Sequence, residues 1–236
     1  MMSYLGSKAA SGAYQAIIAN MPAHDTYIEA YLGTGVIFNR KPPAVRSIGL
    51  ELDAVTLADF NPEREIETYN EDSVAFLDAY TFEEPERTFI YADPPYLEET
   101  RTSNNRYRKD YTRDDHLQML ALYQRLTQQG VQIMISGYPS KLYDETLIGW
   151  RTHTFRVMTR GGVRTEKLWM NYEADSKHWS TYAGKNFTDR QRIKRKANRW
   201  AKNFAAMDTA EQMAVLSAIM DIQSPPVDLC NTYQDI

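Results

Sequence analysis

The residues best suited to chemistry are Asp93-Pro94-Pro95-Tyr96, which directly follow the apolar run Thr88–Ala92. Two consecutive prolines fix φ and remove two backbone donors, so the turn after this predicted strand is stiff. Asp93 then lies at the carboxyl end of a strand, which is where ligands bind in open α/β sheets. A carboxylate, a proline carbonyl and an aromatic ring can together hold a planar heterocycle that carries an amino group. The alternative interpretation is a strand-ending turn with a surface aspartate.

An amino group on such a heterocycle is a poor nucleophile, because its lone pair is delocalised into the ring. Asp93 can accept one of its N–H groups and the carbonyl of Pro94 can accept the other. Both hydrogen bonds strengthen as the nitrogen becomes cationic, which stabilises the transition state of a reaction in which that nitrogen is the nucleophile. Tyr96 can stack on the base and offer its negative face to the developing charge. This chemistry requires no covalent intermediate and no metal.

A glycine turn, Leu32-Gly33-Thr34-Gly35, follows another predicted strand and can bring backbone close to a ligand. Phe38 stands where a dinucleotide fingerprint has its third glycine, which makes a pyrophosphate ligand less favourable. Acidic residues end three predicted strands, although each alone is more often a surface or capping residue: Glu29, then Glu51 or Asp53, then Asp72. Together they suit a ligand with a ribose, an adenine and a positive charge, as in S-adenosylmethionine.

Strand and helix patterns alternate over most of the chain, which predicts an α/β sheet with helices on both faces. The predicted strands are 27–31, 46–51, 65–69, 88–92 and 131–136, with 150–158 and 164–172 forming an antiparallel hairpin about Gly161-Gly162. The predicted helices are 8–20, 35–40, 53–60, 114–128 and 141–148, with a capping-box-like start at Thr112. Residues 173–185 resemble a linker, and 186–222 predict two helices. We therefore expect a domain over residues 1–175 and a basic helical extension over 176–236.

Composition limits the possible classes of protein. The chain has 236 residues, 43% of them hydrophobic, and a net charge of −4, so a nucleic-acid site must come from local clusters of basic residues. The single cysteine, Cys230, excludes an internal disulfide and indicates a reducing compartment. The four histidines lack metal-ligand spacing. No long apolar run or signal segment is present in this sequence, so we expect a cytoplasmic protein without a membrane span.

Several motifs give the chain a family resemblance: Tyr4-Leu5-Gly6-Ser7-Lys8, Ile28–Gly35, Glu51, Asp72, Asp93–Tyr96 and Thr165–Asn171. On these residues the chain resembles Dam-type DNA adenine-N6 methyltransferases, which place the cofactor motifs before the catalytic motif. The resemblance implies a Rossmann-like S-adenosylmethionine-dependent methyltransferase fold. It further implies a mixed seven-stranded sheet with helices on both faces and a C-terminal helical extension. A phage, prophage or mobile-element origin fits the resemblance.

The activity that the resemblance implies is methyl transfer from S-adenosylmethionine to N6 of an adenine flipped out of double-stranded DNA, with S-adenosylhomocysteine as the product. A monomer or a homodimer, in a bacterium or a phage-infected host, would fit it. The Asp-Pro-Pro-Tyr motif also occurs in some RNA guanine methyltransferases. An RNA base methyltransferase and a non-catalytic nucleic-acid-binding protein of the same fold therefore stay open as alternatives.

The resemblance also implies roles for individual residues. Tyr4 and Lys8 would contact the methionine end of the cofactor, and Glu29 its ammonium. Glu51 would bind the ribose, with Asp53 as the alternative, and Asp72 would lie near the adenine. The implied cofactor set is Tyr4, Lys8, Glu29, Tyr31, Leu32, Gly33, Thr34, Gly35, Glu51, Leu52, Asp72, Ser73 and Asp93. The implied catalytic set is Asp93, Pro94, Pro95 and Tyr96.

Basic residues gather in three places that could contact DNA: the loop 97–113, the 160–164 hairpin and the C-terminal helices. Arginine and lysine there could bind phosphates, and an aromatic side chain from the loop could enter the base stack. A mobile solvated loop and a solvated amphipathic helix are the alternatives. The candidate DNA-binding residues are Arg101, Arg106, Tyr107, Arg108, Lys109, Tyr111, Arg160, Arg164, Arg192, Arg195, Lys196 and Arg199.

Asp72 and Asp93 are 21 positions apart (93 − 72), which is too short for the extra recognition domain of many Dam-type enzymes. We therefore expect a short or degenerate recognition sequence of roughly two to four base pairs, because few side chains can reach base edges. Long-read mapping of methylated adenines on a fully treated plasmid would measure it. A single strict site of six base pairs would contradict this expectation.

Overall fold

The structure is a computed structural model, and it describes residues 8, 13–97, 110–159, 162–173 and 187–223. The chain divides into two compact units, Met1–Ala183 and Gly184–Ile236, and each is described by itself. The first unit holds the sheet and the candidate site. Within the described residues, no helix has both the length and the apolar character that a membrane span requires.

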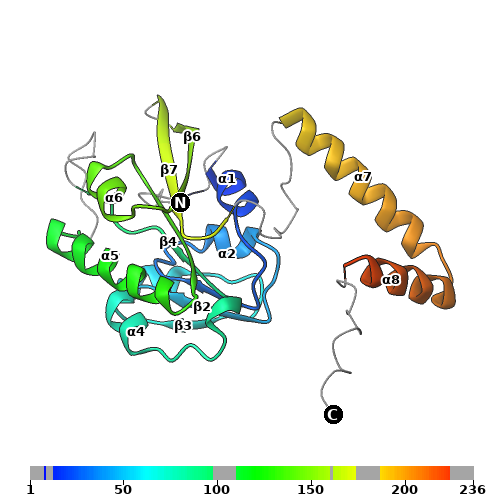
Figure 1. The fold of residues 1–236 in the computed structure, drawn as a ribbon, viewed down its shortest axis with the longest axis horizontal. Helices are drawn as coiled ribbons and strands as arrows, with labels where there is room; N and C mark the ends of the chain where they lie inside the picture. Colours follow the sequence, from blue (N-terminus) through cyan, green and yellow to red (C-terminus); the bar gives the residue numbers. More distant parts are fainter. Residues whose placement is uncertain (1–7, 9–12, 98–109, 160–161, 174–186, 224–236) are drawn as a thin grey trace, which may run out of the picture. The chain divides into compact units, whose positions relative to one another are not determined.

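A seven-stranded mixed sheet forms the centre of the first unit (Figure 1). Its strands are β1 (Thr26–Glu29), β2 (Arg46–Leu50), β3 (Glu67–Tyr69), β4 (Thr88–Ala92), β5 (Gln132–Gly137), β6 (Arg151–Thr159) and β7 (Gly162–Met170). Their order is β3-β2-β1-β4-β5-β7-β6. Strand β7 runs in the opposite direction to the other six strands of this sheet. This topology is the Rossmann-like fold of S-adenosylmethionine-dependent methyltransferases, which confirms the predicted fold class.

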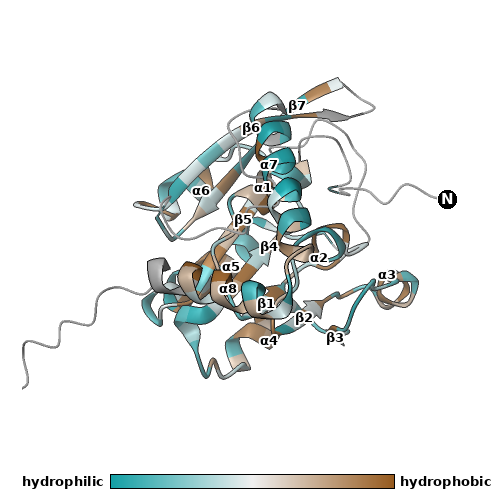
Figure 2. Ribbon diagram, turned by 90° about the vertical axis from the view of Figure 1, so that its right-hand side faces the viewer, coloured by the Kyte–Doolittle hydropathy of each residue, from teal (hydrophilic) through white to brown (hydrophobic). Residues whose placement is uncertain are grey.

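Apolar side chains alternate between the two faces of the sheet and build a core on each. Ile28, Ile90 and Ile133 pack into one cluster with residues of α5 and α6. Tyr27 and Phe89 pack into the other, against α1 and α2. Because side chains on a strand point alternately up and down, strands covered on both faces are apolar throughout. Figure 2 shows this on β4 and β5, which carry mostly hydrophobic colours. The prediction of helices on both faces is confirmed.

Helices precede β1 and connect the later strands of the first unit. They are α1 (Ala13–Ala19), α2 (Val36–Arg40), α3 (Ala54–Asp59), α4 (Ser73–Ala79), α5 (Arg113–Gln128) and α6 (Lys141–Thr146), with a 3-10 turn, η1 (Pro85–Arg87). The predicted capping box at Thr112 is present, with Asp115 as its reciprocal partner. Helix α4 was not predicted. Its start is fixed by Asp72, whose side chain accepts the backbone N–H groups of Val74 and Ala75.

Most predicted boundaries differ from the observed ones by a few residues. The expected helix 141–148 ends at Thr146, because the N–H of Leu147 bonds back to Tyr143 and closes the last turn. The expected strand 65–69 begins only at Glu67, where pairing with β2 starts. The strand Thr88–Ala92 and the antiparallel hairpin of β6 and β7 were predicted correctly.

The described part of the second unit, residues 187–223, forms the helices α7 (Phe187–Ala205) and α8 (Thr209–Gln223), as predicted for residues 186–222. Asp208 caps α8 by accepting the N–H of Glu211. Apolar side chains from both helices line a shared groove, and among them Trp200 remains 60% exposed. The four predicted DNA contacts of this unit, Arg192, Arg195, Lys196 and Arg199, are all exposed on α7.

Gly35 ends the glycine turn with φ of 65°, and a Cβ there would lie 2.1 Å from a ring carbon of Phe60. Gly35→Ala should therefore lower the free energy of unfolding. Left-handed backbone strain should account for about 1–2 kcal/mol of the loss, and overpacking against Phe60 for about 1–3 kcal/mol more. Gly149→Ala is the matched control, because Gly149 also has positive φ (86°) but no atom within 4 Å of its Cβ position. Urea unfolding would compare them, and equal losses of stability would contradict the packing argument.

Candidate active site

The candidate site lies at the carboxyl edge of the parallel strands. Segments that follow β1, β2, β3, β4 and β5 meet there, because parallel strands all end at the same edge. The antiparallel strand β7 begins at this edge instead of ending there, and its register pairs Lys167 with Gly137 at the end of β5. Glu166, the preceding residue of β7, is thereby brought to the same edge.

Asp93 follows β4 directly, and its side chain is 17% exposed. One of its carboxylate oxygens, Oδ1, accepts the Ser136 hydroxyl at 2.9 Å and contacts the Lys8 ammonium at 2.9 Å. Among the described residues, the other oxygen, Oδ2, accepts no hydrogen bond. Burial raises the pKa of Asp93 above its usual value, with Lys8 opposing that rise and Glu166 adding to it.

Lys8 connects Asp93 to two further groups. Its ammonium donates to the Tyr96 hydroxyl and lies 3.3 Å from Oε2 of Glu166. Burial alone would lower the pKa of Lys8, but Asp93, Tyr96 and Glu166 together raise it well above its usual value. Lys8 therefore stays charged at the base of the site.

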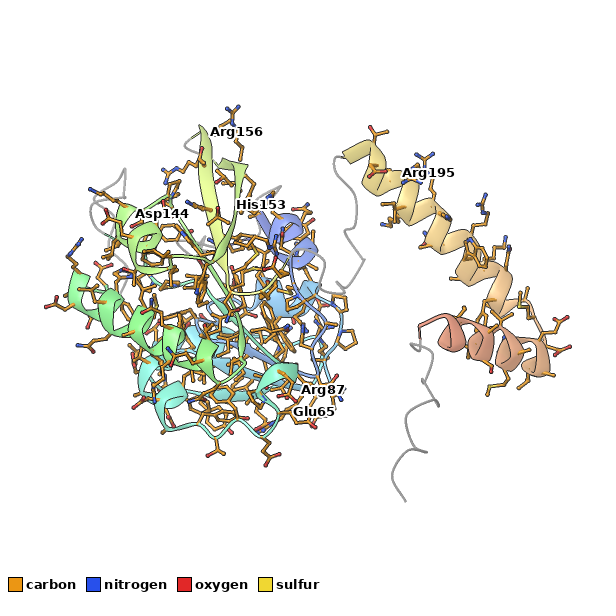
Figure 3. The ribbon with its side chains drawn as sticks, viewed as in Figure 1. Glu65, Arg87, Asp144, His153, Arg156 and Arg195 are labelled. Atoms are coloured by element: carbon orange, nitrogen blue, oxygen red, sulfur yellow. The ribbon has the colours of Figure 1, made fainter. Side chains whose placement is uncertain are left out.

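Aromatic side chains form a second wall of the site. The Tyr96 ring lies 4.4 Å from the Tyr138 ring, tilted by 50°, and the Tyr138 hydroxyl accepts a hydrogen bond from Arg164 at 2.6 Å. Arg164, a predicted DNA contact, is thus linked to the aromatic pair. Arg156, on the neighbouring strand, projects from the outer part of the β6–β7 hairpin (Figure 3).

Glu51 fixes the glycine turn from the end of β2. Its two carboxylate oxygens accept the backbone N–H groups of Gly33 and Asp53, each at 2.9 Å. Burial raises the pKa of Glu51, and these backbone donors oppose the rise. The Asp53 side chain has a different task, because it caps α3 through the N–H and hydroxyl of Thr56. Of the two alternatives for the ribose, only Glu51 lines the pocket described next.

A pocket opens between the ends of β1, β2 and β3. Its described lining contains three carboxylates and no lysine or arginine: Ala30, Tyr31, Leu50, Glu51, Leu52, Glu71, Asp72, Ser73, Pro95 and Tyr111. Asp72 accepts the Tyr111 hydroxyl at 3.3 Å, and Tyr31 donates to Tyr111 at 3.2 Å. Anionic walls disfavour a phosphate ligand and suit hydroxyl, amino or cationic groups.

Glu29 lies on the other face of the sheet from this pocket. It is 2% exposed and accepts the Tyr27 hydroxyl at 2.9 Å. Burial raises its pKa to about 8, so the carboxyl carries a proton at neutral pH. Lys41, also buried, has a pKa lowered by burial to about 7. The predicted role of Glu29 at the cofactor ammonium stays a prediction.

The structure places the other predicted residues in different surroundings. Leu32 is buried in the core on the α1 side, Thr34 is exposed, and Ser73 is buried at the start of α4. Tyr111, predicted to contact DNA, lines the pocket beside Asp72. Seven predicted residues lie outside the described part of the chain: Tyr4, Arg101, Arg106, Tyr107, Arg108, Lys109 and Arg160.

Three residues of the site were not among the predicted site residues: Ser136, Tyr138 and Glu166. Ser136 and Tyr138 surround the end of β5, where the strand pattern itself signals a ligand edge. Glu166 stands within one of the motifs that carry the resemblance, but it is a single acid in a hairpin strand. Only the pairing of β7 with β5 brings it near Asp93.

Comparisons with known proteins give only distant similarities. No family model matches the sequence, and no curated protein matches it. Among solved structures, an rRNA methylase from Streptococcus thermophilus is 11% identical, with a TM-score of 0.42 over 66% of this chain and 90% of its own. The N-methyltransferase NodS from Bradyrhizobium japonicum WM9 is 10% identical, with a TM-score of 0.45 over 68% and 93%. A putative methyltransferase from Streptococcus mutans, in complex with SAH, is 9% identical, with a TM-score of 0.40 over 66% and 94%.

The raised pKa of Glu29 makes stability depend on pH. Between pH 4.5, the usual pKa of a glutamate, and about pH 8, Glu29 holds a proton in the folded protein that it has released in the unfolded chain. The contribution of Glu29 to the stability of the folded protein therefore falls as pH rises through this range. Glu29→Gln should match the wild type near pH 5 and become more stable towards pH 8, by on the order of 1–3 kcal/mol.

Urea unfolding between pH 5 and pH 8 would measure this difference. Glu65→Gln is the matched control, because Glu65 is exposed at the surface (Figure 3) and should show no such trend. An advantage of Glu29→Gln that does not change with pH would show that Glu29 is ionised in the folded protein.

Proposed function

We propose that this protein is an S-adenosylmethionine-dependent methyltransferase that methylates the N6 amino group of adenine in DNA. The observation that carries the proposal is the geometry of Asp93. One of its oxygens is held by Ser136 and Lys8, and the other accepts no hydrogen bond from the described residues. Pro95, in the same turn, lines the pocket of Glu51 and Asp72. A fixed carboxylate with one open oxygen is a specific acceptor for an amino N–H group.

The pocket residues suit S-adenosylmethionine as the cofactor. Glu51 would accept ribose hydroxyls, as an acid at the end of the second strand does in nucleotide-binding α/β folds. Asp72 would lie near the adenine; its carboxylate accepts the Tyr111 hydroxyl, which in turn accepts the Tyr31 hydroxyl. The absence of basic residues from the described lining fits a ligand without phosphate. When bound, the cofactor supplies an electrophilic methyl group.

The remaining chemistry falls to residues around Asp93. Oδ2 of Asp93 and the carbonyl of Pro94 would each accept one N–H of the substrate amine, which orients the nitrogen lone pair. Ser136 and Lys8 hold the carboxylate in place before the substrate arrives, so little reorganisation accompanies the reaction. Tyr96 would stack on the base, with its own ring supported by Tyr138. A base in a duplex would have to be flipped out to reach this edge.

DNA as the partner rests on the motif resemblance and on local positive charge. Arg192, Arg195, Lys196 and Arg199 expose a basic surface on α7, and Arg156 and Arg164 lie on the hairpin next to the site. Phosphate contacts of this kind would bind without regard to sequence. RNA remains the alternative partner, since the same amino-group chemistry would serve a base in RNA.

Parallel assays of methyl transfer from labelled S-adenosylmethionine to duplex DNA, single-stranded DNA and structured RNA would test the proposal. N6-methyladenine in digested DNA is the expected product. Transfer to RNA alone would favour the alternative partner. Binding of nucleic acid without any transfer would contradict an enzymatic function.

Asp93→Asn keeps the shape of the side chain but replaces an acceptor oxygen and removes the charge. We expect kcat to fall by about 100- to 1000-fold, the usual effect of removing one transition-state hydrogen bond. Binding of S-adenosylhomocysteine, measured by calorimetry, should stay within about threefold, because the pocket lies at β1–β3.

Asp78→Asn is the control, as Asp78 is an exposed residue of α4 paired with Arg125. It should leave both quantities unchanged. If Asp93→Asn abolished S-adenosylhomocysteine binding together with activity, the assignment of Asp93 to the substrate amine would be wrong.

A further inference from the structure

Asp93, Lys8 and Glu166 form a buried cluster of two carboxylates and one ammonium. The Lys8 nitrogen lies 2.9 Å from Oδ1 of Asp93 and 3.3 Å from Oε2 of Glu166. Lys8 and Glu166 are 5% and 7% exposed. Charges removed from water are compensated only by near neighbours, so the balance of charge in this cluster affects any ligand that touches it.

The summed charge of Asp93, Lys8 and Glu166 is negative when both carboxylates are ionised. Oε2 of Glu166 accepts no hydrogen bond from the described residues, so Lys8 compensates it through charge alone. Two other cations lie along β7. Lys167 is engaged by Asp144 at 2.6 Å, and the partly exposed Arg164 donates to Tyr138 at 2.6 Å. With both carboxylates ionised, Asp93, Lys8 and Glu166 together sum to one net negative charge. The guanidinium of Arg164, which a bond to a neutral hydroxyl does not neutralise, acts on Glu166 from a partly exposed position.

A methyl donor must come within contact distance of the nitrogen that Asp93 holds, because transfer requires the reacting atoms to be about 3–3.5 Å apart. The sulfur of a bound donor, one bond from that methyl group, would then lie close to the cluster. It is positively charged in S-adenosylmethionine and neutral in S-adenosylhomocysteine. A buried negative charge at that place distinguishes the two molecules, although they share every other group.

We propose that Glu166 sets the net charge of the reaction centre, so that the site binds the cationic methyl donor in preference to its neutral thioether product. This inference rests on the methyltransferase function proposed above. During transfer the positive charge passes from sulfur to the substrate nitrogen and stays beside the cluster, so the preference does not oppose the reaction. Once the nitrogen has released its proton to water, neither product is cationic, so the cluster holds both products less tightly.

Glu166 contacts Lys8, not the reacting atoms, so it is a positioning residue. A purely structural role would weaken both ligands equally when Glu166 is changed. A charge-selecting role changes the ratio of the two dissociation constants. That ratio can be measured in the absence of any methyl acceptor, so the test does not depend on finding the nucleic-acid substrate.

Isothermal titration of the full-length protein with S-adenosylmethionine and with S-adenosylhomocysteine would provide the test. For Glu166→Gln we expect the preference for S-adenosylmethionine to fall about tenfold, the effect of one unit charge roughly 10 Å away at an effective dielectric constant of about 20. Glu166→Asp, which keeps the charge, should stay within about threefold of the wild type. Glu145→Gln, at an exposed residue of α6, should leave the ratio unchanged.

The outcomes separate this inference from the proposal on which it rests. If the wild-type protein binds neither ligand, the proposed cofactor is wrong and this inference falls with it. If it binds both and Glu166→Gln leaves the ratio unchanged, the cofactor stands and the role of Glu166 is refuted. Equal weakening of both ligands by Glu166→Gln and Glu166→Asp would show a structural role and would also refute the inference.

Discussion

One ammonium group, Nζ of Lys8, holds together the carboxyl edge of this sheet. It contacts carboxylates from β7 and from the turn after β4, and it donates to the Tyr96 hydroxyl. Without it, two buried carboxylates would face each other without compensation, which is among the most costly arrangements in a protein. The position of Asp93 therefore depends on a residue near the start of the chain, and the chemistry proposed for Asp93 depends on that position.

The antiparallel strand β7 gives the site a part that an all-parallel sheet would lack. In an all-parallel sheet, only residues that follow the strands gather at the carboxyl edge. Because β7 runs the other way and lies between β5 and β6, its first residues reach the same edge. This is how Glu166 and Arg164 come to stand beside Lys8 and Tyr138. Lys167, the next residue of β7, forms an ion pair with Asp144 instead, so adjacent charged residues of one strand bind different partners.

The site separates into two regions of different chemistry. The pocket at β1–β3 is lined by carboxylates, tyrosines and apolar residues; of its acids, Asp72 also caps α4 and Glu51 also holds the glycine turn. The region at β4, β5 and β7 holds a charged cluster beside an aromatic pair. Because Glu51 and Asp72 also make structural hydrogen bonds, their positions in the pocket are fixed before a ligand binds, which reduces the entropy lost on binding.

The sequence alone determined the fold class and the strand that carries Asp93, because apolar runs and turn residues act over short distances. The glycine turn, the capping box at Thr112 and the β6–β7 hairpin followed from the same local rules. Helix α4 was missed, since its main signal is a single capping aspartate that also suited a ligand role. Glu51 and Asp53 could not be separated by spacing. The tertiary structure distinguishes them by their contacts, because Asp53 accepts a hydrogen bond from Thr56 and Glu51 accepts one from Gly33. It alone joined Lys8, Ser136 and Glu166 to Asp93, because contacts between residues far apart in the chain depend on strand order and register, which no local pattern contains.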